Sequence, residues 1–404
     1  MLHLDIKQCP DSQVQFQLPI DFSYTVRTPP VPKLKMSKLF TPLDVGRMRL
    51  SHRIAMSPMT RFRNDDTHVP LPMVTDYYAQ RGAVPGTLLI TEATLISPRA
   101  GGFPNVPGIW SEAQTAQWRQ VTDAVHAKGS YIYMQLWGLG RVANPEVLKR
   151  EGPNDLISSS AVPVTPESPV PRELTEEEIQ GFIGDYAQAA KNAIAAGFDG
   201  VEIHGANGYL IDQFTQDTCN QRTDGWGGSV EKRSRFALEV IRAVVEAIGA
   251  DRTGIRYSPF SRFQGMRMAD PAEQFTYLAR KTAEFKLAFV HVVEPRIAGN
   301  ADVVVQGDSL DFFLDAYGGA GPVIVAGGYG AESAKEAADS QYKDHEVLVG
   351  IGRPFTSNPD LPFMVQKGIP LRPYEREWFY NPKDPKGYAD YDYSEEFKAI
   401  ATLA

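Results

Sequence analysis

The chain has 404 residues, of which 43% are hydrophobic and 22% are charged, values typical of a globular protein. Its formal net charge of -8 at pH 7 disfavours nucleic acid and anionic membranes as partners, since both attract basic surfaces. No apolar run approaches the roughly 18 residues that suggest a membrane span. The two cysteines, Cys9 and Cys219, form no disulfide framework and lack metal-ligand spacing, which favours a reducing compartment such as the cytoplasm.

The first 36 residues differ from the rest of the chain. They lack the basic start and apolar core of a secretory signal. Pro29, Pro30 and Pro32 predict an extended, flexible arm over residues 1–36. Organised sequence begins at Met36, and residues 37–404 are predicted to form one domain with a C-terminal extension.

A regular alternation of strands and helices follows the arm. Each predicted strand is a short run rich in β-branched or aromatic residues and apolar on both faces, as in a buried parallel strand. The predicted strands are 53–60, 87–97, 130–140, 199–206, 252–259, 287–296, 321–330 and 345–355. Apolar spacing, capping residues and terminal glycines predict helices at 111–129, 174–197, 229–249, 271–285, 309–317 and 331–342.

Eight such strands predict an α/β fold of the (β/α)8 TIM-barrel type. An open doubly wound sheet is the alternative, but that fold has a glycine-rich turn after its first strand, and nothing glycine-rich follows Thr60. Residues 143–171, rich in Pro, Ser and Asn, are too long for a plain connection. They are predicted to be a lid-like insertion after the third strand.

In such barrels the chemistry lies at the carboxyl ends of the strands, where the residues share one mouth. Any one polar residue there could be satisfied structurally, but polar groups at most of these ends favour a functional site. The strand ends carry Thr60 and Arg61, Glu92 and Ala93, Gln135 and Trp137, His204 and Asn207, Arg256, Glu294 and Arg296, Gly327 and Gly328, and Gly352 and Arg353.

The last two strand ends predict an anion site. Gly327, Gly328 and Gly330 lead from a strand into a helix, so that backbone N–H groups can face a ligand. Arg353 adds a fork of donors suited to phosphate, and barrels commonly bind phosphate after strands seven and eight. The alternative is that the glycines only form a tight turn. The spacing is not that of a dinucleotide fingerprint.

Gln135 and Arg256, further round the barrel, suggest a phosphorylated planar cofactor such as a flavin. An amide can pair with the uracil-like edge of the ring, and a guanidinium there stabilises the negative charge of the reduced ring. None of the eight strand ends carries a lysine, which disfavours a Schiff-base mechanism. No cluster of histidines and carboxylates has metal-ligand spacing, so no metal is expected.

His204, Asn207 and Tyr209 form a candidate catalytic group. His204 and Asn207 are three residues apart, which in a helical turn places both on one side, and both can donate hydrogen bonds to one substrate oxygen. Tyr209 has a phenol whose ordinary pKa of about 10 suits a proton donor to a carbanion. A capped helix start with a buried tyrosine is the structural alternative.

The motif HGANGYL at 204–210, followed by QRTDGWGGSVEKRSRF at 221–236, resembles the signature of the old yellow enzyme family, FMN-dependent ene-reductases, in its fungal branch. The similarity extends over nearly all of 39–388. It includes SPMTRFR, LLITEATLISPRAGG, MQLWGLGR, RYSPF, FVHVVEPR, AGGY and GRPFTSNPDLPF.

The resemblance implies roles for these residues. Thr60 would bind the flavin carbonyl beside the reactive nitrogen, and Pro58 and Ala93 would line the ring. The remaining roles are Gln135 and Arg256 at the pyrimidine edge, Gly327, Gly328, Gly352 and Arg353 at the phosphate end, His204 and Asn207 on the substrate oxygen, Tyr209 as the proton donor, and Trp137 and Tyr380 in the substrate pocket.

The resemblance also implies a ping-pong reaction. NADPH or NADH reduces FMN and leaves, then the β-carbon of an enone, enal or nitroalkene takes a hydride and Tyr209 protonates the α-carbon. The expected chain is a monomer or homodimer. A tailoring reductase or isomerase of fungal secondary metabolism is the alternative, although isomerising members tend to lack the tyrosine. A flavin-free lyase or isomerase barrel is a further alternative. No motif of the family matches residues 296–308, which border the substrate in that family.

Overall fold

A computed structural model of the chain describes residues 36–299, 301–304 and 307–401. The predicted arm lies, apart from Met36, outside the described residues. The chain from Ser37 onward forms one compact unit.

Eight parallel strands close into a barrel, so the open-sheet alternative is wrong. Each strand pairs with the next along the chain, and the last pairs with the first. The strands are β3 (Ile54–Met56), β4 (Leu88–Ile90), β6 (Tyr131–Trp137), β9 (Gly200–Gly205), β10 (Thr253–Tyr257), β11 (Phe289–Val293), β14 (Val323–Ala326) and β15 (Val347–Ile351).

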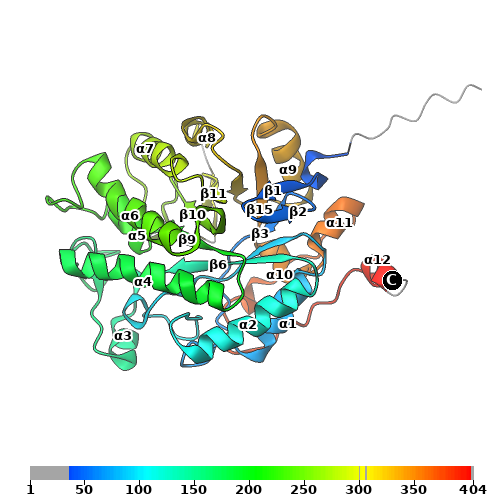
Figure 1. Cartoon of the computed structure of the whole chain (residues 1–404), viewed down its shortest axis with the longest axis horizontal. Coiled ribbons are helices and arrows are strands. Elements are labelled where there is room, and N and C mark those ends of the chain that lie inside the picture. The colour runs from blue at the N-terminus through cyan, green and yellow to red at the C-terminus, as the bar shows by residue number, and fades with distance from the viewer. Residues whose placement is uncertain (1–35, 300, 305–306, 402–404) are drawn as a thin grey trace, which may run out of the picture. The chain divides into compact units, whose positions relative to one another are not determined.

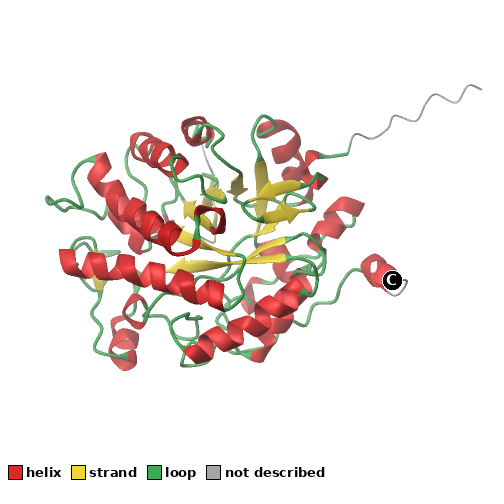
Figure 2. Cartoon of the chain, viewed as in Figure 1, coloured by secondary structure: helices red, strands yellow, loops and turns green. Residues whose placement is uncertain are grey.

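Helices surround this barrel and alternate with its strands along the chain (Figure 1). Figure 2 shows the strands at the centre and the helices outside them. The alternating helices are α1 (Pro72–Arg81), α2 (Glu112–His126), α4 (Glu176–Ala195), α6 (Val230–Ile248), α7 (Ala272–Ala283), α8 (Asp311–Tyr317), α9 (Ala331–Glu336) and α11 (Leu361–Lys367). Shorter helices are α3 (Pro145–Glu151), α5 (Leu210–Thr215), α10 (Arg353–Ser357) and α12 (Glu395–Ala401).

Local sequence explains where the main helices begin. Ser111 and Gln114 form a capping box at the start of α2, and Thr175 and Glu178 form one at the start of α4. Each box satisfies two of the backbone N–H groups that a helix start leaves open. The helices predicted for these segments are therefore confirmed, with ends that differ by a few residues.

Alternation along each strand sorts the core into two layers. Ile54 and Met56 belong to the large cluster that includes the helices, whereas Ala55 between them belongs to a separate cluster with Phe289 and Ile324. Because successive side chains of a strand point to opposite faces, this second cluster fills the barrel interior. The hairpin of β1 (Leu43–Val45) and β2 (Met48–Leu50) contributes to the same cluster, so apolar side chains fill this layer of the barrel.

Buried arginines attach the C-terminal extension to the barrel. Arg61 and Arg63 both donate hydrogen bonds to the carbonyl of Phe379, and Arg61 also reaches the carbonyl of Gly387 at 2.7 Å. The two arginine side chains are at most 1% exposed. The extension is therefore part of the folded unit.

The insertion after β6 contains α3 and the short strand β7 (Ile157–Ser158), which pairs with β8 (Arg172–Glu173). Arg141 holds it through hydrogen bonds to the carbonyls of Val162 and Pro163.

Candidate active site

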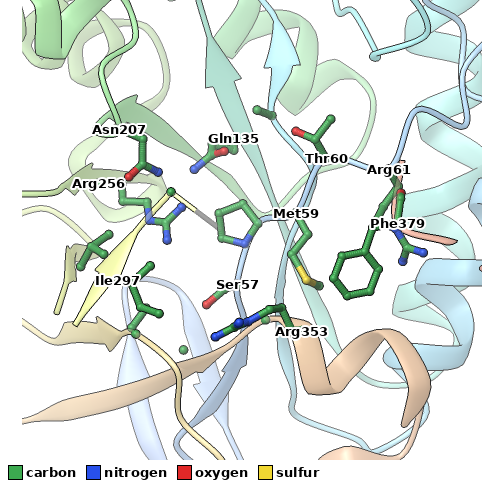
Figure 3. Close-up of a pocket in the computed structure, with 18 of the residues that line it drawn as sticks. Ser57, Met59, Thr60, Arg61, Gln135, Asn207, Arg256, Ile297, Arg353 and Phe379 are labelled. Carbon is green, nitrogen blue, oxygen red and sulfur yellow. The ribbon is translucent and has the colours of Figure 1, made fainter. Parts of the chain in front are cut away.

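A cavity of about 570 Å³ opens at the carboxyl ends of the barrel strands. Figure 3 shows Gln135, Asn207 and Arg256 at one end, Arg353 at the other, and Ser57 and Met59 between them. Every site residue expected from the sequence lies on the wall of this one cavity: Pro58, Thr60, Ala93, Gln135, Trp137, His204, Asn207, Tyr209, Arg256, Gly327, Gly328, Gly352, Arg353 and Tyr380.

The register of the strands brings the polar residues into one layer. Gln135 pairs with Glu202 across β6 and β9, and His204 pairs with Arg256 across β9 and β10. These positions share the parity of the apolar interior residues, so their side chains point into the barrel. The interior is therefore apolar in one layer and polar in the layer that faces the cavity.

His204 is a neutral hydrogen-bond donor. It is 4% exposed, and burial, together with the nearby charges of Arg256 and His291, places its pKa well below the ordinary value. The N–H of Ala206 donates to His204 Nδ1 at 3.4 Å, so Nε2 carries the proton. A neutral imidazole with a fixed tautomer can donate to a ligand oxygen.

Asn207 follows β9 in a left-handed turn, not in the helical turn that the spacing suggested. Its φ is 56°, a conformation that asparagine tolerates better than most residues, and its backbone N–H donates to Ser258 Oγ at 2.7 Å. Its Oδ1 atom is buried and has no hydrogen-bond partner among the described residues. An asparagine in this conformation, with an unpartnered amide oxygen and a place on a cavity wall, is typical of a ligand-binding residue.

Tyr209 completes this side of the cavity. Its ring lies 4.8 Å from the Trp137 ring and 5.0 Å from the His204 ring between centroids, in edge-to-face arrangements. Burial raises the pKa of Tyr209 to about 12. The phenol thus keeps its proton at neutral pH and lies beside the donor of His204.

Gln135 and Arg256 line the same end of the cavity. Arg256 Nε is buried and has no partner among the described residues. Burial lowers the pKa of Arg256 from its ordinary value, and the Glu202 carboxylate opposes that shift. A guanidinium with an unpartnered N–H and an amide on the same cavity wall suit a polar ring edge with both donors and acceptors.

At the other end, Arg353 already holds an anion. Its two terminal nitrogens donate to the Asp302 carboxylate at 2.8 and 2.6 Å, in the bidentate geometry that also suits phosphate. Gly328, at φ 66°, lies beside this pair. The helix after these glycines, α9, has only six residues, and the N–H of Gly330 is already bonded to Ser333 Oγ at 2.9 Å. Arg353 is therefore the main anion-binding feature.

Three polar strand-end residues, Glu92, Glu294 and Arg296, do not line the cavity and instead form hydrogen bonds within the barrel framework. Glu92 accepts a hydrogen bond from the N–H of Arg61. The carboxylate of Glu294 accepts from the phenols of Tyr329 and Tyr342, while Arg296 Nε donates to the carbonyl of Gly327. The insertion 143–171 also contributes no residue to the described cavity wall.

Five further aromatic side chains on the cavity wall were not predicted from the sequence. They come from loops that are far apart in the sequence, and only the closed barrel brings them together. They are Phe62, Phe103, Phe263, Tyr374 and Phe379. Phe62 and Phe103 lie within or beside motifs already noted, and an aromatic residue next to a strand-end motif is the signal that could have found them.

The fold and the cavity define a class of protein. A barrel mouth with an arginine fork for phosphate at one end, an amide and a guanidinium at the other, and small residues such as Ala93 and Gly350 in its wall fits a flat phosphorylated cofactor. The donors match FMN, which would meet Arg353 with its phosphate and Gln135 and Arg256 with its ring edge.

Comparison with known proteins identifies the family. The chain matches the NADH:flavin oxidoreductase / NADH oxidase family over residues 38–372. It is 69% identical over 370 residues to a chanoclavine-I aldehyde reductase of Penicillium roqueforti, covering 91% of this chain and all of that one. It is 55% identical over 368 residues to an NADP-dependent oxidoreductase of Aspergillus flavus, covering 89% and 97%. The crystal structure of old yellow enzyme from Pichia sp. AKU4542 superposes with a TM-score of 0.82 at 38% identity, covering 89% of this chain and 94% of the other.

The chain therefore belongs to the NADH:flavin oxidoreductase / NADH oxidase family, in the fungal branch of the old yellow enzymes. It is an oxidoreductase whose cofactor is FMN and whose reductant is NADH or NADPH. No helix within the described residues is long and apolar enough to cross a membrane.

Proposed function

We propose that this chain is an ene-reductase that saturates the C=C bond conjugated to a carbonyl group, with an enal of fungal secondary metabolism as its natural substrate. The observation that carries the proposal is the group formed by His204, Asn207 and Tyr209 at one end of the cavity. The His204 and Tyr209 rings are in contact, and Asn207 lines the same cavity, so that two hydrogen-bond donors for an oxygen and a protonated phenol share one site.

In this proposal each residue has one task. His204 and Asn207 hold the carbonyl oxygen of the substrate and stabilise the negative charge that grows on it. Tyr209 holds a proton for the α-carbon until that charge has developed. Bound FMN, once reduced, supplies the hydride for the β-carbon.

The relatives and the cavity wall support the choice of substrate. The Penicillium roqueforti relative is named for its action on an aldehyde, so an α,β-unsaturated aldehyde is the expected class here. Phe62, Phe103, Trp137 and Phe263 on the wall favour a substrate with a large flat apolar body. We also propose NADPH as the reductant, since the Aspergillus flavus relative is NADP-dependent, and a cytoplasmic location, since the cysteine usage suits a reducing compartment.

A product analysis with an enal tests the proposal. Purified protein loaded with FMN and supplied with NADPH should convert the enal to the saturated aldehyde, with the C=O group intact. In D2O the product should carry one deuterium at the α-carbon and none at the β-carbon. An allylic alcohol as the product would show reduction of the aldehyde itself and would refute the proposal. A panel of enones and nitroalkenes run beside the enal measures the breadth of the substrate class.

An isomerase is the second candidate. In that case the hydride added to the β-carbon would return to the flavin after rotation about the resulting single bond, and Tyr209 would not protonate the α-carbon. The signature of an isomerase in the same experiment is a product of unchanged mass that forms without net consumption of NADPH.

A further inference from the structure

Behind the cavity wall, a buried carboxylate links two strands that are not neighbours. Glu202 on β9 is 0% exposed. Its Oε1 accepts a hydrogen bond from Gln135 Nε2 on β6 at 2.7 Å, and its Oε2 lies 2.7 Å from His291 Nδ1 on β11. Gln135 is 1% exposed and His291 is 0% exposed. Each carboxylate oxygen thus has one partner in a site that excludes water.

This contact fixes the orientation of the Gln135 amide. An ionised carboxylate only accepts hydrogen bonds, so Gln135 must turn its NH2 group toward Glu202. The Oε1 atom and one remaining N–H are then available on the cavity side. If the amide were reversed, its carbonyl oxygen would face the carboxylate and the NH2 group would be turned away from it, which leaves two buried acceptors in contact.

A fixed amide matters because the uracil-like edge of FMN has an N–H donor between two carbonyl acceptors. An acceptor at Gln135 pairs with that N–H, whereas a donor in its place repels it. The orientation of the amide that would face this edge is thus set by a residue that does not line the cavity.

Glu202 also compensates positive charge. Its carboxylate opposes the loss of charge that burial would cause at Arg256, the guanidinium on the same side of the cavity. Only a carboxylate can accept hydrogen bonds from both neighbours, since an amide has a single acceptor oxygen. A glutamine at this position keeps one acceptor oxygen, so either the Gln135 amide must turn or the His291 ring must change tautomer and accept at Nδ1.

We propose that Glu202 is a positioning residue for FMN, which sets the orientation of the Gln135 amide and the charge balance beside the flavin ring. The proposal rests on the binding of FMN in this cavity and deepens it. Glu202 acts through Gln135 and Arg256 and does not line the cavity itself.

Titration of apoprotein with FMN, followed by the quenching of FMN fluorescence, tests the orientation role. We expect Glu202→Gln to raise the Kd for FMN by about three- to tenfold, the value of one net hydrogen bond. In a Gln135→Ala background the same substitution should change the Kd by less than about twofold, because the amide it orients is gone. Asp360→Asn, at a buried carboxylate that bonds Ser394 and lies outside the cavity wall, is the matched control and should leave the Kd unchanged.

The flavin midpoint potential tests the charge role. Loss of a negative charge beside the ring should shift the potential of Glu202→Gln to a more positive value, because the reduced flavin carries negative charge. Glu202→Asp keeps the charge but is shorter by about 1.5 Å, one carbon–carbon bond. It should weaken FMN binding while leaving the potential close to that of the wild type, and it serves as the second variant if Glu202→Gln does not fold.

Two results would overturn the inference. One is an unchanged Kd and an unchanged potential in Glu202→Gln, or an unchanged Kd in Glu202→Asp where Glu202→Gln does not fold. The other is a full loss of FMN affinity on Glu202→Gln in the Gln135→Ala background, which would show that Glu202 does not act through that amide. Wild-type protein that fails to quench FMN fluorescence would instead refute FMN binding itself, and the two failures are thereby distinguished.

Discussion

Removal of the Tyr209 hydroxyl should separate the two half-reactions. Tyr209→Phe keeps the ring contacts with Trp137 and His204, so the cavity wall should remain intact. With a pKa of about 12, the phenol is ionised in about one molecule in 10⁵ at pH 7, so the wild-type enzyme always presents a proton. General acid catalysis contributes roughly 10²- to 10⁴-fold, or about 3 to 5 kcal/mol of barrier.

Stopped-flow absorbance of the flavin measures both half-reactions. We expect reduction by NADPH to change by less than about twofold, and reoxidation by an enal to slow by about 10²- to 10⁴-fold. A nitroalkene should be affected much less, because the anion left by hydride addition is stabilised on the nitro group and does not need a prompt acid. Tyr257→Phe, at a buried tyrosine that bonds Thr282 outside the cavity wall, is the control. Loss of flavin reduction in Tyr209→Phe would refute the proton-donor role.

The charges and pKa values of other groups lead to three more predictions. A phenol bound as its phenolate offers the site a negatively charged oxygen like that of the polarised substrate, so it reports on the oxygen ligands. Replacement of both His204 and Asn207 by leucine should weaken phenol binding by at least about tenfold, the value of one to two hydrogen bonds. Unchanged phenol affinity in a titration followed by flavin absorbance would contradict their role as oxygen ligands. Asp302→Asn should lower the Kd for FMN several-fold, measured by calorimetry, because the phosphate of FMN must displace the Asp302 carboxylate from Arg353. An equal or higher Kd would show that Asp302 does not compete with the phosphate for Arg353. Burial raises the pKa of Glu92 to about 7, so its contribution to the stability of the fold is full below about pH 4.5 and is lost as the pH rises through 7. Glu92→Gln should therefore remove a pH dependence of about 3 kcal/mol in the free energy of unfolding. Urea unfolding at several pH values measures this, and free energies of unfolding that change in parallel with pH in the variant and the wild type would contradict it.

The alternation of strands and helices predicted the barrel, and the common direction of parallel strands predicted that residues such as Gln135 and Arg353 meet at one mouth, however far apart they are in the chain. Other residues of the cavity wall, such as Pro58 and Tyr380, were predicted only from the resemblance to the family. The helices α1 and α11 were not predicted. Helix α11 has too few turns for apolar periodicity to be detected, and the apolar residues of α1 are only weakly confined to one face.

Contacts between side chains were beyond sequence reasoning. The link from Gln135 through Glu202 to His291 depends on how the strands are staggered around the barrel, and no local pattern encodes that stagger. The ion pair of Arg353 and Asp302 joins a predicted phosphate ligand to the segment 296–308, where no motif could be assigned.

The buried arginines make the segment from Phe379 to Gly387 part of the fold. The family match stops at residue 372, and an engineer guided by it could regard the remaining residues as an expendable tail. A protein cut there would lose the carbonyls of Phe379 and Gly387 that accept hydrogen bonds from Arg61 and Arg63, together with the Phe379 and Tyr388 rings that pack on the two guanidinium groups. Shortening at residue 372 should therefore lower the stability of the barrel and not merely widen its entrance, and purification tags at this end belong after the last helix.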